Sequence, residues 1–177
     1  MDKEKERILK SYIREVPDYP IKGILFYDIT TALKNPEALK IITGGLKETY
    51  KDLGITKVVG IESRGFIGGA ILANELGAGI ALIRKPGKLP AETIKKSYAK
   101  EYGIDTIEIH RDAIDENDVV VLHDDLLATG GTMAAAYELV MSMKPKKVYI
   151  SFIIELENLN GRDLFPEDVE VSSLIKY

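Results

Sequence analysis

Val119-Val-Val-Leu-His-Asp-Asp-Leu-Leu-Ala-Thr-Gly-Gly-Thr132 is the stretch that decides the fold of this 177-residue chain. Its first four residues are apolar, which is typical of a strand buried on both faces in a parallel sheet. Two acids follow, then a turn of small residues, and residues 131–143 have the composition of a helix. A buried strand that leads directly into a helix indicates an α/β fold.

The segments on either side of this stretch repeat the alternation. Short apolar runs at 57–61 and 80–83 predict buried strands, and the sequence between them predicts a helix from about Phe66 to Leu76. Residues 148–154 predict a further strand. We therefore expect one α/β domain over residues 1–177, with a mostly parallel central sheet flanked by helices.

The N-terminal part of the chain carries two helical patterns. Residues 2–16 have apolar side chains at helical spacing, with charges between them. Asn35 followed by Pro36 is a good helix start, because asparagine caps free amides and proline needs no donor in a first turn. An apolar stripe follows, and Gly54 fits the end of this helix. The stripe consists of Leu39, Ile42, Leu46, Tyr50 and Leu53.

Residues 84–103 differ in character from the rest of the chain. Their sequence, RKPGKLPAETIKKSYAKEYG, is rich in lysine, has two prolines and shows no sustained apolar period. A segment of this length and composition is typical of a long functional loop or flap. The alternating residues 106–109 predict an exposed strand directly after it.

Composition excludes several classes of chemistry. The 24 basic and 28 acidic side chains give a net charge of −4, which disfavours a generic grip on nucleic acid. The absence of cysteine excludes disulfides, thiolate metal sites and a cysteine nucleophile. Only two histidines, His110 and His123, are present, which disfavours a histidine-rich metal site. A Walker A motif is excluded because Leu89 follows Gly87-Lys88 where serine or threonine is required.

The sequence predicts a soluble, cytoplasmic protein. The charged N-terminus has no apolar core of the kind that a secretory signal needs. Residues 65–83 look apolar enough for a membrane, but Asn74 and Glu75 lie near the middle. An acid at that depth costs roughly 2.5–3.5 kcal/mol on insertion scales. A buried helix followed by a buried strand explains this stretch better, so we expect no contact with a membrane.

The predicted strands end in residues suited to a sugar phosphate. Ligands bind beyond the carboxyl ends of the strands in such folds. The amides of residues 129–132 and the hydroxyls of Thr129 and Thr132 suit a phosphate monoester, since glycine permits close approach and a helix N-terminus attracts anions. Asp124 and Asp125 stand where they can accept hydrogen bonds from sugar hydroxyls. Alternatively the turn only caps the helix, and the acids only cap a loop.

Two basic segments follow the other buried strands. The Arg64 guanidinium, flanked by Ser63 and Gly65, can hold a polyphosphate through paired hydrogen bonds, or it can pair with Glu62 or with an acid at the sheet end. Three more cations gather at 84–88. They are solvated charges or, given their place after a buried strand, contacts for pyrophosphate. These cations are Arg84, Lys85 and Lys88.

Five segments together resemble a known family. The stretch HDDLLATGGT resembles the phosphoribosyl pyrophosphate signature of type I phosphoribosyltransferases, and its LLATGGT form resembles the adenine phosphoribosyltransferases in particular. The other segments are similar to that family's blocks and stand in the same order, within a match from about residue 15 to residue 165. They are FYDI at 26–29, ESRGF at 62–66, RKPGKLP at 84–90 and SYAKEYG at 97–103.

The resemblance implies a fold and an activity. It implies the type I phosphoribosyltransferase fold, with a small hood at about residues 1–35 and a flexible flap at about 84–105. The implied reaction transfers the 5-phosphoribosyl group from phosphoribosyl pyrophosphate to adenine, giving AMP and pyrophosphate. Mg²⁺ is expected to enter with the donor and to need no direct protein ligand, and a homodimer is expected. The alternatives are another purine base as acceptor, or a weakly catalytic protein that senses the donor.

The resemblance also implies residue roles. Glu101 is expected to manage the purine proton and Tyr102 to close over the site. By itself, Phe26 is a stacking surface or a core residue. The resemblance implies that it stacks on the purine, a contact that contributes roughly 1–3 kcal/mol to binding. The backbone near it is expected to read the base edge. The expected catalytic residues are Glu101, Asp124 and Asp125, and the expected binding residues are Leu25, Phe26, Tyr27, Ser63, Arg64, Gly65, Arg84, Lys85, Lys88, Tyr102, Ala128, Thr129, Gly130, Gly131 and Thr132.

Two positions depart from the family pattern. Tyr27 stands where relatives often carry arginine. If the backbone reads the base there, adenine recognition survives; if the side chain matters, base preference changes. His123 replaces a branched apolar residue before the acidic pair. It either lies in the sheet end as a neutral imidazole or reaches the sugar, and we favour the first role and expect no catalysis from it.

Overall fold

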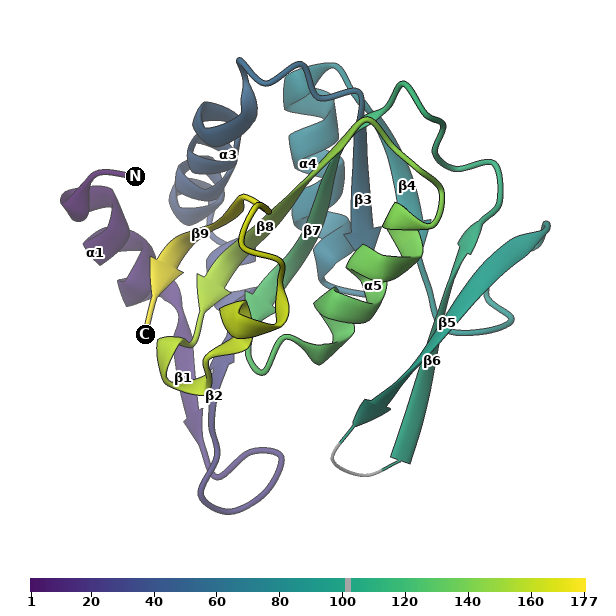
Figure 1. The fold of residues 1–177 in the computed structure, drawn as a ribbon. Helices are drawn as coiled ribbons and strands as arrows, with labels where there is room; N and C mark the ends of the chain where they lie inside the picture. The colour runs from purple at the N-terminus through teal and green to yellow at the C-terminus, as the bar shows by residue number, and fades with distance from the viewer. Residues whose placement is uncertain (101–102) are drawn as a thin grey trace.

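A parallel sheet forms the centre of the molecule (Figure 1). The structure is a computed structural model that describes residues 1–100 and 103–177. In this described part, five parallel strands stand in the order β4-β3-β7-β8-β9, as the alternation predicts. The strands are β3 (Lys57–Ile61), β4 (Gly79–Ile83), β7 (Val119–Leu127), β8 (Lys147–Glu155) and β9 (Val171–Lys176).

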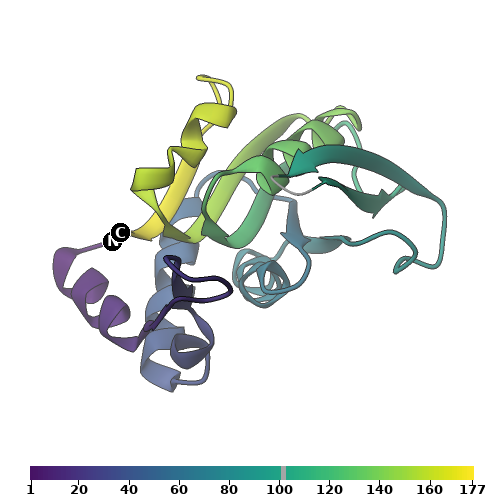
Figure 2. The same cartoon turned by 90° about the horizontal axis from the view of Figure 1, so that it is seen from below.

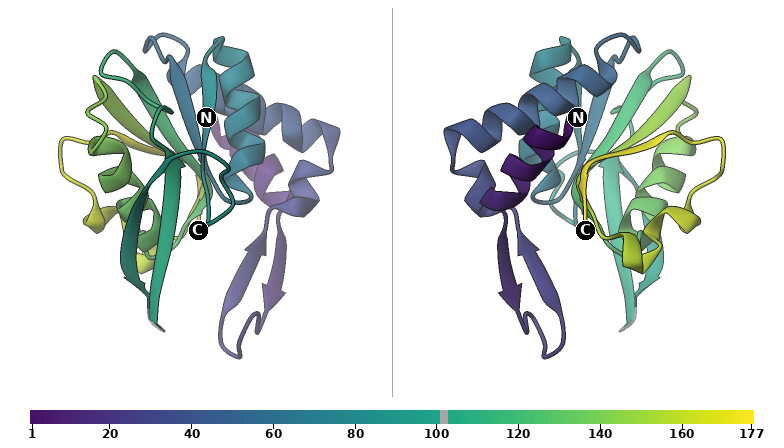
Figure 3. Two further views of the ribbon diagram at one scale, coloured as in Figure 1. Left: turned by 90° about the vertical axis from the view of Figure 1, so that its right-hand side faces the viewer. Right: turned by 90° about the vertical axis from the view of Figure 1, so that its left-hand side faces the viewer.

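Helices cover both faces of this sheet (Figure 3). One face carries α1 (Lys3–Tyr12), α2 (Thr30–Leu33), α3 (Pro36–Tyr50) and α4 (Gly65–Leu76), and the other carries α5 (Gly131–Met141). Two short 3₁₀ turns, η1 (Glu157–Leu159) and η2 (Gly161–Leu164), connect β8 to β9. Each face has its own cluster of buried apolar side chains. The fold is therefore three-layered.

Two antiparallel hairpins project past the end of the sheet to which the arrows of β3 and β7 point (Figures 1 and 3). The first pairs β1 (Arg14–Pro17) with β2 (Leu25–Asp28), and the second pairs β5 (Thr93–Lys100) with β6 (Gly103–His110). Figure 2 looks at the molecule from this end. Because β4 and β7 lie on opposite sides of β3, the chain changes direction there, and such a switch point is where open α/β sheets bind ligands.

The predicted start of α3 is confirmed in detail. The Asn35 side chain accepts hydrogen bonds from the amides of Glu37 at 2.9 Å and Ala38 at 3.1 Å, and Pro36 is the first helical residue. The helix ends at Tyr50, earlier than predicted, and Gly54 makes a left-handed turn four residues later with φ of 65°. The local cap therefore predicted the start of the helix better than the apolar stripe predicted its end.

The predicted helix over residues 2–16 is too long. It ends at Tyr12, and residues 14–17 form β1, with Val16 opposite Phe26. The apolar spacing of residues 13–16 is compatible with both structures. Hydrogen bonding to β2, the next strand along the chain, favours the strand.

The segment at 84–103 is also more regular than predicted. Residues 93–100 of this segment form β5, which pairs with β6 along its whole length. The strand predicted as exposed at 106–109 has three buried residues, because the hairpin packs against α5 and β4. Ile107, Glu108 and Ile109 are 3%, 1% and 0% exposed.

The apolar stretch at 65–83 is a helix followed by a strand, as predicted. It forms α4 and β4, and Gly77 ends the helix in a left-handed conformation with φ of 65°. Within residues 1–100 and 103–177, the helices are too short or too polar to span a membrane.

Candidate active site

The turn between β7 and α5 forms the centre of the candidate site. Gly130 adopts φ of 82° and precedes the first residue of α5, so the amides of the helix start are directed out of the turn. A cavity of 120 Å³ lies against this turn and extends from Asp124 to Met133 and to Phe152 of β8. Small residues, two threonine hydroxyls and a helix N-terminus thus line one space, which suits a phosphate group.

A residue that the sequence analysis missed supports this turn. A Cβ atom at Gly161 would lie 2.2 Å from the carbonyl oxygen of Ala128, and a Cβ at Gly130 would lie 2.5 Å from the carbonyl oxygen of Gly161. Arg162 fixes the segment by donating from Nη2 to the buried Glu155 at 2.7 Å. A Gly-Arg pair shortly after a buried strand that ends in glutamate was the available signal.

The acidic pair lies inside β7, a correction to the predicted position after the strand. Pairing with β8 continues through Asp124 opposite Phe152, which extends the strand to Leu127. Asp125 is 5% exposed, and its amide donates to Asp124 Oδ1 at 2.9 Å. Burial, and then the charge of Asp125, raise the pKa of Asp124 well above its usual value.

Arg64 and Gly65 join the turn after β3 to this acidic pair. The Arg64 guanidinium donates from Nε to Asp125, so the alternative of an ion pair with a sheet-end acid is what the structure shows. Burial opposes the charge of Arg64, but the bond to Asp125 raises its pKa overall. A Cβ at Gly65 would lie 2.8 Å from the carbonyl oxygen of His123, so only glycine permits this approach. Ser63 is exposed beside them.

Phe26 faces the same group from the β1–β2 hairpin. The Arg64 guanidinium carbon lies 5.8 Å from the centre of the Phe26 ring, and Tyr19 meets that ring edge-on at 5.2 Å. The ring is therefore held beside the candidate site. Leu25, the preceding residue, is 40% exposed.

The Tyr27 side chain does not share this position. Its ring lies 4.1 Å from the ring of Tyr177 and packs against the apolar cluster beneath α1 and α3. Burial raises the pKa of Tyr27. Successive side chains of a strand point to opposite faces, so the ring that faces Arg64 and the ring that faces Tyr177 belong to neighbouring residues.

The cations after β4 lie around a second cavity. Arg84 donates from Nε to Glu62 at 3.1 Å, and the Lys85 amide donates to the same carboxylate at 3.0 Å. These two hydrogen bonds lower the pKa of Glu62. The Lys85 ammonium pairs with Asp105, while Lys88 is exposed. The cavity measures 160 Å³ and is lined by Ile61, Glu62, Ile83, Arg84, Lys85, Tyr98, Ile107, Asp124 and Thr132.

Asp124 and Thr132 line both cavities. The turn at residues 128–132, called the phosphate-suited turn below, therefore adjoins the acidic pair and the cations. This agrees with the strand-end rule, by which ligands bind beyond the carboxyl ends of the strands. Glu101 and Tyr102 lie outside the described residues, so their predicted places are not observed. Among residues 1–100 and 103–177, no three histidines or acids gather in a way that could hold a metal ion.

His123 is buried behind the acidic pair. It is 0% exposed, and its Nδ1 lies 3.1 Å from the Ser151 hydroxyl. The space beside Nε2 is left by Gly68 of α4, where a Cβ would lie only 2.3 Å away. Burial lowers the pKa of His123 to about 4, so the ring is neutral at pH 7, as predicted.

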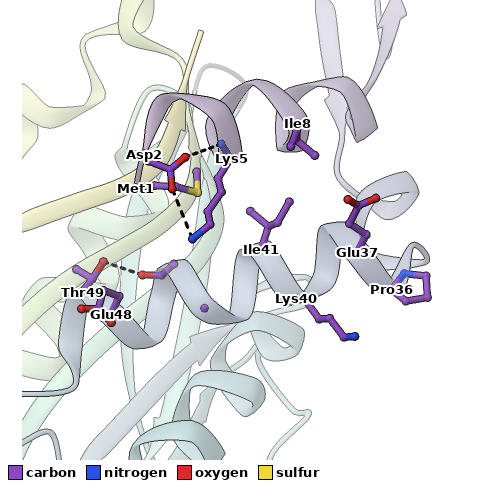
Figure 4. A pocket seen from close by; sticks show the side chains of 12 residues that line it. Met1, Asp2, Lys5, Ile8, Pro36, Glu37, Lys40, Ile41, Glu48 and Thr49 are labelled. Carbon is purple, nitrogen blue, oxygen red and sulfur yellow. Dashed lines mark hydrogen bonds and ion pairs between the residues drawn. The ribbon is translucent and has the colours of Figure 1, made fainter.

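A larger cavity, of 1010 Å³, lies elsewhere (Figure 4). It is bounded by two ranges, residues 1–8 around α1 and residues 36–49 of α3. The strand ends contribute none of its lining residues. Size alone would select this groove, whereas the paired acids, cations and phosphate-suited turn select the switch point.

Comparison with known proteins identifies the family to which this arrangement belongs. The phosphoribosyl transferase domain matches residues 28–171. The chain belongs to the phosphoribosyltransferase family. It is 66% identical over 171 residues to the adenine phosphoribosyltransferase of Bacteroides thetaiotaomicron, with 97% of each chain covered.

Solved structures of adenine phosphoribosyltransferases are also similar to this chain. The adenine phosphoribosyltransferase of Rhodothermus marinus superposes with a TM-score of 0.93 at 47% identity, over 99% of this chain and 100% of the relative. The APRTase of Giardia lamblia, complexed with 9-deazaadenine, gives 0.90 at 43% identity, over 96% of each chain. The resemblance drawn from the motifs is thereby confirmed, and the chain is a transferase of the adenine phosphoribosyltransferase group.

Proposed function

We propose that this phosphoribosyltransferase transfers the 5-phosphoribosyl group from phosphoribosyl pyrophosphate to adenine, releasing AMP and pyrophosphate. The observation that carries the proposal is the pair of cavities that share Asp124 and Thr132. One adjoins a turn suited to a phosphate monoester and the other adjoins a group of cations. A donor with a phosphate group at each end of a ribose matches this arrangement.

The turn at 128–132 would hold the 5′-phosphate, and Asp124 and Asp125 would accept hydrogen bonds from the ribose hydroxyls. Fixing the sugar in this way makes the attack effectively intramolecular. As pyrophosphate departs, positive charge develops on the ribose ring. The oxygens of the acidic pair are already oriented in the folded protein, so they stabilise that positive charge without reorganising.

The leaving pyrophosphate would contact residues 63–65, Arg84, Lys85 and Lys88. Arginine can bind it through paired hydrogen bonds, and lysine contributes charge. Mg²⁺ would enter as part of the donor and neutralise the leaving group, bound mainly by phosphate and ribose oxygens. Such an ion needs few protein ligands, and the acids among the residues that line the two cavities are Glu62 and Asp124.

The purine would stack on Phe26, and the backbone of residues 25–27 would read its edge. Because the Tyr27 side chain packs on Tyr177, it would not read the base, so its departure from the family's arginine is compatible with recognition by the backbone. This supports adenine as the base. Glu101 would take or give the purine proton, and Tyr102 would help to exclude water, which otherwise hydrolyses an activated ribosyl donor.

One assay tests the proposal. The purified protein is mixed with phosphoribosyl pyrophosphate, Mg²⁺ and each purine base separately, and the nucleoside monophosphate is measured. We expect AMP from adenine and little product from hypoxanthine, guanine or xanthine. Product from another base would assign that base instead. Donor binding without any product would favour the alternative, a regulator that senses the donor.

We further infer a homodimer with a cytoplasmic location, and a division of the single domain over residues 1–177 into functional parts. The hood at about 1–35 corresponds to α1, the β1–β2 hairpin and α2, and the flap at about 84–105 includes β5. These assignments remain predictions. A partner subunit would be expected to add cations to those at 84–88.

A further inference from the structure

The β5–β6 hairpin touches the candidate site through two cross-strand partners, Tyr98 and Asp105. The Tyr98 hydroxyl lies 3.0 Å from the Thr132 hydroxyl and 3.3 Å from Asp105 Oδ2. The same Asp105 oxygen pairs with the Lys85 ammonium. A continuous polar chain therefore runs from Thr132, beside the phosphate-suited turn, to Lys85, beside the second cavity.

The chemistry of these groups sets the direction of the hydrogen bonds. A carboxylate only accepts, so the Tyr98 hydroxyl donates to Asp105, and its oxygen is left to accept from Thr132. Asp105 is held in place by a further bond, since its Oδ1 accepts from the Thr106 amide at 2.9 Å. The polar chain thus includes one well-oriented anion, Asp105, whose side chain is only 19% exposed, while that of Lys85 is 47% exposed.

The two ends of this chain are groups to which the proposed function assigns phosphates. Lys85 would bind the pyrophosphate, and Thr132 would bind the 5′-phosphate. A carboxylate that pairs with Lys85 must give up part of that contact when a pyrophosphate arrives, and its charge repels the incoming anion. Asp105 and the pyrophosphate therefore compete for one ammonium group.

We propose that Asp105 is a positioning residue that weakens the hold of Lys85 on pyrophosphate and so speeds the release of this product. The inference rests on the proposed function. Differences in affinity between closely related complexes lie mostly in dissociation rates, and product release limits turnover in many enzymes. An internal anion that replaces the product on its cation lowers the barrier to release.

The hairpin offers a matched control. Lys96 of β5 pairs with Glu138 of α5, a second contact between hairpin and body that involves neither Lys85 nor Thr132. Glu138→Gln breaks that ion pair and loosens the hairpin without altering the charge beside the cavity. Asp105→Asn removes the anion and keeps the shape of the side chain.

The experiment measures binding of pyrophosphate with Mg²⁺, and separately of AMP, to the full-length wild type and both variants by titration calorimetry. For Asp105→Asn we expect pyrophosphate to bind roughly three- to tenfold more tightly, AMP to change less than twofold, and kcat to fall. The gain should shrink at high salt, because the competing pair is partly exposed. Glu138→Gln should leave both affinities unchanged.

A different pattern would overturn the inference. Weaker binding of both ligands by Asp105→Asn would mean that the residue only supports the hairpin, and unchanged affinities would mean that it does not compete. If Asp105→Asn does not fold, Tyr98→Phe provides the second variant: Asp105 then loses one hydrogen-bond donor and pairs more strongly with Lys85, so pyrophosphate should bind more weakly. Unaltered pyrophosphate binding by Tyr98→Phe would contradict the competition. Failure of the wild type to bind pyrophosphate or to form AMP would instead refute the proposed function.

Discussion

Gly68 and His123 share a space that holds only one side chain. A Cβ at Gly68 would lie 2.3 Å from His123 Nε2, inside a buried contact between α4 and β7. Gly68→Ala should lower the free energy of unfolding by about 1–3 kcal/mol through overpacking. This loss should appear although alanine favours a helix by up to about 1 kcal/mol over glycine. Urea unfolding measures the change.

The neighbouring glycine supplies the control. A Cβ at Gly69 would meet its nearest atom at 3.5 Å, an ordinary contact, so Gly69→Ala should be neutral or slightly stabilising. In a His123→Val background the cost of Gly68→Ala should fall, because the clashing nitrogen is gone. Strictly additive losses in this double-mutant cycle would show that the crowding lies elsewhere.

His123 should also make stability depend on pH. Burial lowers its pKa to about 4 in the folded protein, against 6.5 in the unfolded chain. The unfolded state therefore binds more protons between these values, and stability is lost as the pH falls from 6.5 toward 4. Between pH 7 and pH 5 the wild type should lose about 2 kcal/mol more than His123→Val. Urea unfolding at the two pH values measures these losses. If the wild type and His123→Val lost the same free energy of unfolding, the buried neutral ring would be contradicted.

Glu101 is assigned the chemical step rather than the binding of the donor. Glu101→Ala should therefore reduce kcat by about 100-fold, the usual size of a general acid–base contribution. The Kd of phosphoribosyl pyrophosphate should stay within about twofold, since Glu101 is assigned no contact with the donor. Steady-state kinetics and donor titration separate the two, and parallel losses would indicate a supporting role.

Several residues of the site could be predicted from the sequence, but the residues that they contact could not. Asp124, Asp125 and Arg64 were expected from their places at strand ends. The bond between Arg64 and Asp125 joins the turn after β3 to a residue of β7 that is 61 positions away, so it depends on sheet order. The contact of Gly161 with Ala128 likewise requires knowing that the segment after β8 folds back beneath the turn.

At the scale of secondary structure, the sequence predicted an element well where the interactions that form it lie close together along the chain. The cap at Asn35 acts within three residues, and the start of α3 was therefore predictable. The strand β5 was not, because its lysines suggested a solvated loop. Only its pairing with β6 and its packing on α5 show that Ile94 and Tyr98 turn inward.

The 3₁₀ turn η2 should determine how well the phosphate-suited turn is formed. Gly161→Ala would place a Cβ 2.2 Å from the Ala128 carbonyl oxygen and displace the turn that the 5′-phosphate is proposed to occupy. The KM for phosphoribosyl pyrophosphate should rise about tenfold, while the KM for adenine changes less than about twofold. Steady-state kinetics with each substrate varied measures both.

Gly44→Ala is the control for this substitution, because its Cβ position on α3 faces open space. It should leave both KM values unchanged. If Gly161→Ala raised both constants equally, the displacement would extend beyond the phosphate-suited turn and the assignment of η2 as its support would be wrong.

At the scale of the whole molecule, the sheet order explains why remote segments form one site. The turns after β3 and β7 are neighbours because β3 pairs with both β4 and β7. The strand-end rule predicted this meeting point from the sequence. The positions of the two hairpins were not predictable in this way, because they lie outside the sheet and depend on packing against its helices.

AMP should therefore bind across segments that the sheet alone does not connect. Its phosphate would lie at the start of α5 and its base against Phe26 in the β1–β2 hairpin. At a concentration of 100 times its Kd, AMP should raise the free energy of unfolding by about 2.7 kcal/mol. Hydrogen exchange should slow at both segments, because closing the site suppresses local opening.

Ribose 5-phosphate lacks the base and separates the two contacts. It should protect the amides at the start of α5 and leave the exchange of Leu25 and Phe26 unchanged, whereas AMP protects both. Phe26→Ala should abolish the second effect of AMP while retaining the first, since the substitution leaves the turn at 128–132 intact. Protection of the hairpin by ribose 5-phosphate, or its persistence in Phe26→Ala, would mean that the hairpin responds to the phosphate and that the purine binds elsewhere.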